Sequence, residues 1–246
     1  MHHTPLAWDD RYLINKHAEN FMKPGLNLPS LDANATLTRL QIREDAAGGS
    51  TSILLHLTFP QASHTDRGAP QAADMLLVVP HSTSGPATTA TTVATEISLT
   101  LQWYNKTATH APETIWLSSV PVAPTRDAWT MDKMGSRVNP LDANLTGTGS
   151  CPNGITCGVH LHAVGDGGIQ YSGAEAPGPL TLRSLDSALV SIGAPLAAPA
   201  PLVAPDPTLG VHFSLVNNVW NTNYPLWYPF AEGDQSSRFR FTIAIP

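Results

Sequence analysis

A regular alternation of apolar and polar residues runs through residues 92–104 and constrains the fold more than any other feature. Positions two residues apart from Val93 to Trp103 are apolar or threonine, and the positions between them include Glu96, Ser98 and Gln102. Successive side chains of a β-strand point to opposite faces, so the pattern predicts a strand with one buried and one wet face.

The same period recurs along the chain, with turn sequences rich in Gly, Pro, Ser and Asp between the runs. The strand candidates are 35–43, 53–59, 75–79, 92–104, 114–120, 129–131, 159–164, 168–171, 180–185, 211–215 and 238–245. No helical pattern of ten or more residues appears after residue 30. The sequence therefore predicts an all-β fold, an antiparallel β-sandwich with less than about 10% helix. We expect residues 1–34 to form an irregular lead-in and residues 35–246 to form one sandwich domain.

Composition and charge exclude several classes of protein. Charged residues make up 13% of the chain and the net charge is −6, with no basic run. Nucleic acid and anionic membranes are therefore not expected as main partners. No stretch of 18 apolar residues occurs, so no membrane span is expected. The first residues lack the basic and apolar regions of a signal peptide, which suggests a cytosolic protein or the C-terminal piece of a longer one.

Two cysteines, Cys151 and Cys157, flank the turn sequence Pro152-Asn153-Gly154. Such a turn can bring the two thiols together, and we expect a disulfide, although two unrelated thiols are the alternative. A disulfide would place the protein in an oxidising compartment and favours secretion.

His160 and His162 share one face of a predicted strand and precede the glycine-rich turn at 165–168. They suit the wall of a saccharide site. They also suit the wet face of a sheet, or a metal site if Asp166 or His212 supplied a third ligand. We expect no metal and no cofactor in this chain.

The segment 217–228 is dense in asparagine and aromatic residues. Its candidate ligand-binding residues are Asn217, Asn218, Trp220 and Asn223. Carboxamides offer paired donors and acceptors to hydroxyl groups, and an indole can stack on a sugar ring. A buried structural corner would use the same groups. We expect these residues to lie beside His160 and His162 on one surface.

The chain displays no catalytic set. It lacks a nucleophile elbow, a P-loop, a dinucleotide fingerprint and a zinc-protease helix. Its carboxylates are scattered, and spacing selects no pair for glycoside hydrolysis. His64-Thr65-Asp66 is a weak metal signal in a loop rich in Pro and Gly.

Several stretches resemble one family in the same order. They are LQWYNKTAT at 101–109, PETIWLS at 112–118, MDKMGS at 131–136, NPLD at 139–142, HLHAVGDG at 160–167, LDSALV at 185–190, NNVWNTNYPLW at 217–227 and RFRFT at 238–242. Together they resemble the C-terminal region of an uncharacterised family of fungal and bacterial secreted proteins. The N-terminal half of that family resembles the α-mannosidases of glycoside hydrolase family 38.

The resemblance implies a mutarotase-like supersandwich that follows a catalytic barrel. In α-mannosidases the barrel carries the zinc ion and the catalytic carboxylates, and no counterpart of the barrel occurs here. We therefore expect a secreted sandwich that binds carbohydrate or supports a barrel of the same polypeptide. The alternatives are a free-standing carbohydrate-binding module and a purely structural β domain.

Overall fold

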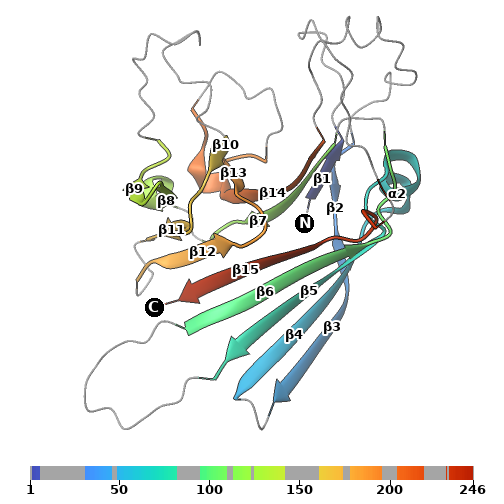
Figure 1. Cartoon of the computed structure of the whole chain (residues 1–246), viewed down its shortest axis with the longest axis horizontal. Coiled ribbons are helices and arrows are strands. Elements are labelled where there is room, and N and C mark those ends of the chain that lie inside the picture. The colour runs from blue at the N-terminus through green and yellow to red at the C-terminus, as the bar shows by residue number, and fades with distance from the viewer. Residues whose placement is uncertain are drawn as a thin grey trace, which may run out of the picture.

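Two antiparallel β-sheets account for most of the described chain. The computed structural model describes residues 2–5, 31–45, 49–81, 95–109, 113–122, 125–141, 161–173, 178–195, 204–218, 231 and 233–245 (Figure 1). For residues 2–5 and for Asn218 it describes the backbone alone. Every strand pair in this part of the chain is antiparallel, as the alternation predicted.

The larger sheet, sheet B, has nine strands in the order β3-β4-β5-β6-β15-β12-β11-β8-β9. Its strands are β3 Thr36–Asp45, β4 Ser50–Thr58, β5 Ala72–Pro80, β6 Thr95–Tyr104, β15 Arg238–Ile245, β12 Leu180–Ser184, β11 Ile169–Tyr171, β8 Trp129–Lys133 and β9 Ser136–Val138.

The smaller sheet, sheet A, has six strands in the order β10-β13-β14-β7-β1-β2. Its strands are β10 Leu161–Ala163, β13 Leu189–Ile192, β14 Val211–Asn218, β7 Glu113–Ser119, β1 His2–Pro5 and β2 Ala33–Asn34. Two short 3₁₀ turns, η1 Arg126–Ala128 and η3 Pro207–Leu209, lie in connections between strands.

The core lies between the two sheets, as expected of a β-sandwich. Leu101 and Trp103 of β6 are 0% and 1% exposed, and Ile115 of β7 is 0% exposed. The rings of Phe213 in sheet A and Phe241 in sheet B meet edge to face with centroids 5.3 Å apart. The predicted apolar face of 92–104 is thus the inner face of sheet B, where sheet A covers it.

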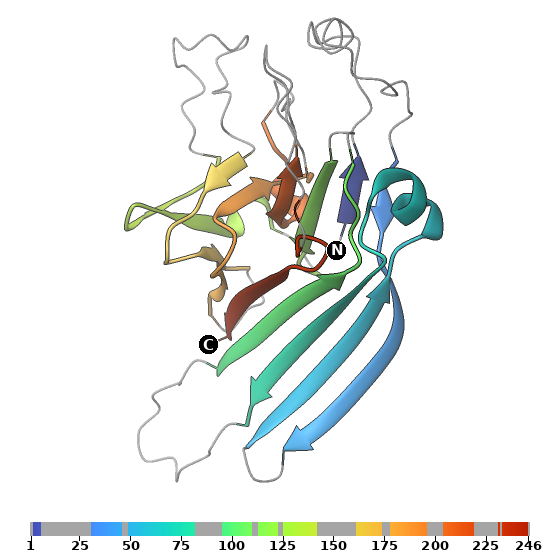
Figure 2. The same ribbon diagram turned by 45° about the vertical axis from the view of Figure 1, so that its right-hand side comes forward.

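Sheet B extends beyond sheet A on one side (Figures 1 and 2). Cross-strand pairing places Ile42 on the same face as the buried Leu99, through Ile53 and Leu77. Leu99 is 7% exposed and Ile42 is 63% exposed. The apolar face of β3 and β4 was predicted from its alternation, but its burial depends on a covering sheet that ends before β3.

Two expectations from the sequence need correction in this region. Residues 75–79 were predicted as a short buried run. They belong to a nine-residue strand, and they are half-buried except for Leu76, which is 37% exposed. Residues 1–34 were expected to be irregular. Within them His2–Pro5 pairs with β7 and Ala33–Asn34 pairs with β1, whereas residues 6–30 lie outside the described residues, so that part of the prediction is untested. These short strands have no alternating pattern; the edge of β7 supplies the backbone partners of β1, and β1 supplies those of β2.

The helix α2, Gln61–Arg67, replaces a predicted loop. Its seven residues are too short to show a helical repeat of apolar side chains. Pro60 precedes it, and Gly68 ends it with a left-handed backbone at φ 77°. A proline before a helix and a glycine after it are recognised boundary signals, so Pro60 and Gly68 could have predicted this helix.

Candidate functional site

Most of the residues predicted to form the site lie outside the described part of the chain. These are His160, Trp220 and Asn223, and the predicted disulfide partners Cys151 and Cys157. Asn218 is described by its backbone alone. His162 and Asn217 are described in full, and they lie in the same sheet.

The register does not bring His162 and Asn217 together. His162 pairs with Val190, which pairs with Phe213, so His162 shares the inner face of sheet A. Asn217 pairs with Thr114 of β7. Thr114 is separated from the inward-facing Leu117 by an odd number of positions, so it points to the opposite face of the sheet. Asn217 therefore lies on the outer face, roughly 14 Å from His162 by strand spacing. A common surface for these two residues would have to be formed around the edge of the sheet.

His212 is not placed to complete a metal site with His162. It pairs with Ser191 and faces the outer side of sheet A, opposite to His162. It is 4% exposed, with Nδ1 2.8 Å from Ser118 Oγ and Nε2 hydrogen bonded to the Gly193 carbonyl oxygen. The carbonyl oxygen can only accept, so a neutral ring carries its proton on Nε2 and accepts at Nδ1 from the hydroxyl. Within the described ranges no three histidine, cysteine or acidic residues lie close enough to hold a metal ion.

The glycine-rich turn after His162 closes on a protein side chain. Asp132 of β8 is 8% exposed, and its carboxylate accepts from the amides of Gly135 and Gly167 at 2.8 Å. A Cβ built on Gly165 or Gly167 would come within 2.9 Å of that side chain. The space beside these glycines is therefore occupied by the Asp132 side chain.

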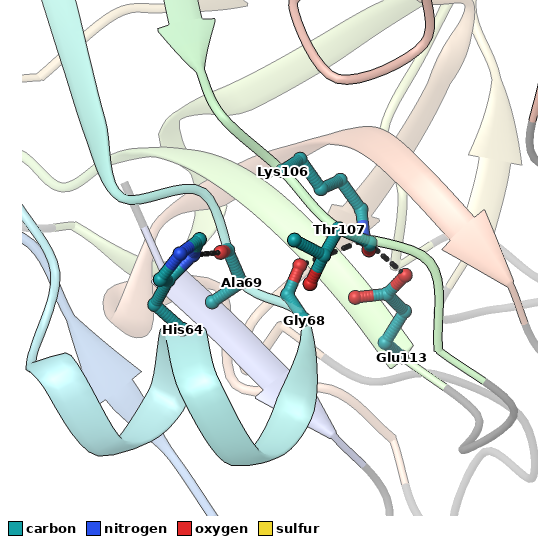
Figure 3. A network of polar contacts seen from close by, with 6 residues as sticks. All are labelled: His64, Gly68, Ala69, Lys106, Thr107 and Glu113. Carbon is teal, nitrogen blue, oxygen red and sulfur yellow. Dashed lines mark hydrogen bonds and ion pairs between the residues drawn. The ribbon is translucent and has the colours of Figure 1, made fainter. Parts of the chain in front are cut away.

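A buried ion pair lies where β6 ends and β7 begins (Figure 3). Lys106 Nζ is 2.5 Å from Glu113 Oε1, and the two side chains are 4% and 3% exposed. The ammonium group also donates to the carbonyl oxygens of Gly68 and Thr107, both at 3.1 Å. Three acceptors match its three N–H donors, which is how a buried charge is tolerated.

This ion pair connects α2 to both sheets. Gly68 ends α2, and a Cβ on it would lie 2.9 Å from the Thr107 carbonyl oxygen, so glycine permits the close packing. His64 Nδ1 donates to the Ala69 carbonyl oxygen at 2.8 Å (Figure 3). The histidine of the His64-Thr65-Asp66 signal is therefore hydrogen bonded to the backbone just after its own helix.

The described start of the segment rich in asparagine and tryptophan lies beside this ion pair. Asn218, the last residue of β14, pairs with Glu113 in the sheet register.

A second group of polar residues lies on the outer face of sheet B. One cross-strand row joins Arg39, His56, Asp74, Gln102 and Arg238, from the adjacent strands β3, β4, β5, β6 and β15. We call this set the outer row. Neighbouring members lie about 5 Å apart, so the row spans about 19 Å.

The centre of the outer row is hydrogen bonded. His56 Nδ1 donates to Asp74 Oδ1 at 2.6 Å, and the Tyr104 hydroxyl donates to Asp74 Oδ2 at 3.2 Å. Burial, together with the neighbouring Asp74 carboxylate, raises the pKa of the Tyr104 hydroxyl above its ordinary value. The His56 and Asp74 side chains remain 30% and 28% exposed, so a ligand can reach them.

The outer row offers binding chemistry. Its carboxylate accepts, its guanidinium groups donate, and its imidazole and carboxamide can do both. Sequence reasoning overlooked it because its members are 17 to 136 residues apart and meet only through strand pairing. The available signal was the polar side of the alternating strands, to which the pattern at 92–104 assigns Gln102.

A cavity of about 220 Å³ lies between the sheets. Its side chains are mainly apolar and come from both sheets, among them Met75, Leu99, Leu117, Phe213 and Phe241.

Among the described residues no helix is long and apolar enough to span a bilayer. Comparison with known protein families, curated proteins and solved structures returned no match.

Proposed function

We propose that this chain is a carbohydrate-binding β-sandwich. The observation that carries the proposal is the outer row, in which five adjacent strands present donors and acceptors on one exposed sheet face. Sugar hydroxyls both donate and accept, so a mixed row of neutral and charged groups can pair with them along a chain of sugars.

The hydrogen bonds within the row support this function. Both oxygens of Asp74 are held by His56 and Tyr104, which fixes the carboxylate before a ligand arrives. Preorganised polar groups lose less conformational entropy on binding. The segment at 217–228 is a second candidate contact region, through Asn217, Asn218, Trp220 and Asn223.

A panel of neutral and acidic polysaccharides, measured by affinity electrophoresis and calorimetry, tests the proposal. We expect wild-type chain to bind at least one polysaccharide and His56→Ala to weaken that binding about tenfold, the effect of losing about one well-placed hydrogen bond. His81→Ala is the matched control, because His81 bonds Thr51 at the end of β5 and lies outside the row. Equal loss in both variants, or no binding by the wild type, would refute the proposal.

A scaffold role beside a catalytic barrel is the second candidate. The exposed apolar face of β3 favours it, because Leu37, Leu40 and Ile42 are 49%, 52% and 63% exposed. Large contiguous apolar surface is uncommon on a protein that works alone. The resemblance to proteins related to glycoside hydrolase family 38 suggests that the barrel of the same polypeptide covers this face and holds any zinc.

An antibody against this chain, used on the source organism, tests the scaffold role. A polypeptide long enough to include a barrel supports it, and a band at 26.2 kDa alone contradicts it. The same experiment on culture fluid tests secretion. In secreted material, intact mass before and after reduction and alkylation reveals whether Cys151 and Cys157 form a disulfide.

A further inference from the structure

The outer face of sheet B is rich in arginine, although the whole chain has a net charge of −6. Strand pairing places five arginines on this face, namely Arg39, Arg43, Arg183, Arg238 and Arg240. The chain has only 13 lysines and arginines in total, so cationic groups are concentrated on this face.

Two of these arginines are already paired with carboxylates. The Arg240 side chain makes two bonds to Asp186, at 2.7 and 3.0 Å, and its backbone amide makes a third at 2.7 Å; this pairing lowers the pKa of the Asp186 carboxyl. Arg183 lies 3.8 Å from Glu96, at the limit of an ion pair. Their charge is therefore largely neutralised within the protein.

The other three arginines form no ion pair with a carboxylate of the described residues, although the charge of Arg238 also contributes to the lowered pKa of the Asp186 carboxyl. Arg39, Arg43 and Arg238 are exposed, and among the described residues no carboxylate lies within ion-pair distance of any of them. Arg39 and Arg238 stand at the two ends of the outer row, with His56, Asp74 and Gln102 between them. The row thus has a cation at each end and hydroxyl-binding groups in the middle.

This order of groups points to an acidic glycan. A planar guanidinium donates two parallel hydrogen bonds to a carboxylate or a sulfate, which are the anionic groups of acidic sugars. A single exposed ion pair contributes little binding free energy. Useful affinity therefore needs several anionic groups along one ligand molecule. The central Asp74 carboxylate accepts from hydroxyl donors, which sugars supply and the phosphate groups of nucleic acid do not.

We propose that the outer row binds an acidic polysaccharide, with its anionic groups at Arg39 and Arg238 and its hydroxyl groups at His56, Asp74 and Gln102. This inference rests on the proposed carbohydrate-binding function and names its substrate class. Carboxylated and sulfated glycans share the required chemistry.

Calorimetry with oligogalacturonate as the carboxylated probe, chondroitin sulfate as the sulfated probe and mannan as the neutral probe tests the proposal. We expect wild-type chain to bind one acidic probe more tightly than mannan, and to lose affinity as salt rises. The double variant Arg39→Gln/Arg238→Gln should lose about tenfold or more of that affinity. Arg126→Gln is the matched control, because Arg126 is exposed on η1, outside sheet B.

The outcomes separate the two proposals. Binding of mannan alone would overturn the acidic ligand and leave carbohydrate binding in place, whereas binding of no glycan would overturn both. Equal loss in Arg126→Gln would show attraction to charge anywhere on the surface and would also overturn the inference. Equal affinity for single-stranded DNA, lost in the same double variant, would assign the row to polyanions in general and refute a glycan site. Thermal melts of each variant confirm that the fold is retained.

Discussion

Removing the ammonium group of Lys106 tests how the two sheets and α2 are held together. Lys106→Met keeps the length of the side chain but deletes three hydrogen bonds, one of them to the carboxylate of Glu113, which is 2% exposed. Breaking a buried ion pair by removing one partner costs about 3–5 kcal/mol. For a chain of this length that predicts a fall in the melting temperature of roughly 6–20 °C.

The control for this prediction is another lysine bonded to a backbone carbonyl oxygen. Lys133 Nζ donates to the Ala163 carbonyl oxygen at 2.6 Å in an exposed setting, so Lys133→Met should cost about 1 kcal/mol. Urea unfolding followed by tryptophan fluorescence measures both variants.

A double variant decides whether the ion pair itself is responsible. In Lys106→Met/Glu113→Met no charge remains buried without its partner, so the combined cost should fall short of the sum of the single costs by about 1–3 kcal/mol. A loss below about 1 kcal/mol in Lys106→Met, or strict additivity in the double variant, would refute the reasoning.

Three further predictions follow from the turns and from the outer face. Asp132→Ala should cost about 1–2 kcal/mol, because the half-buried amide of Gly167 and the amide of Gly135 lose their acceptor, and faster hydrogen exchange in both glycine turns is the check. Gly168→Ala should destabilise the chain more than Gly49→Ala in thermal melts. Both have positive φ, but a Cβ overlaps a backbone carbonyl only at Gly168, so equal melting temperatures would contradict the packing argument. The lowered pKa of Asp186, caused first by its side-chain bond to Arg240, means that its contribution is present above the ordinary aspartate pKa of 3.8 and lost as the pH falls below it. Asp186→Asn should therefore cost less than about 1 kcal/mol at pH 7 and flatten the acid side of the stability profile, and an unchanged profile would argue against the pairing.

The local strand pattern was readable because it depends on residues two positions apart. The alternation at 92–104 identified β6, Thr95–Tyr104, and the last run identified β15 at its exact bounds, Arg238–Ile245. Pleating alone assigns side chains to two faces, so the all-β class and the antiparallel sandwich needed no long-range information. The strand β13, Leu189–Ile192, was not predicted, because the apolar Leu189 stands at one of its outward positions and breaks the alternation.

Tertiary structure alone decided which faces are covered and which distant residues meet. Ile42 and Leu99 have the same place in their strand patterns, but sheet A covers Leu99 and stops short of Ile42. Lys106 pairs with Glu113 and donates to the end of α2, and the glycine-rich turn donates to Asp132. The local sequence pattern does not encode these contacts. The outer row likewise joins residues from position 39 to position 238 because five strands pair in one register. A sequence sets the period of each strand, whereas neighbours along a sheet are set by the free energy of burying all the strands together.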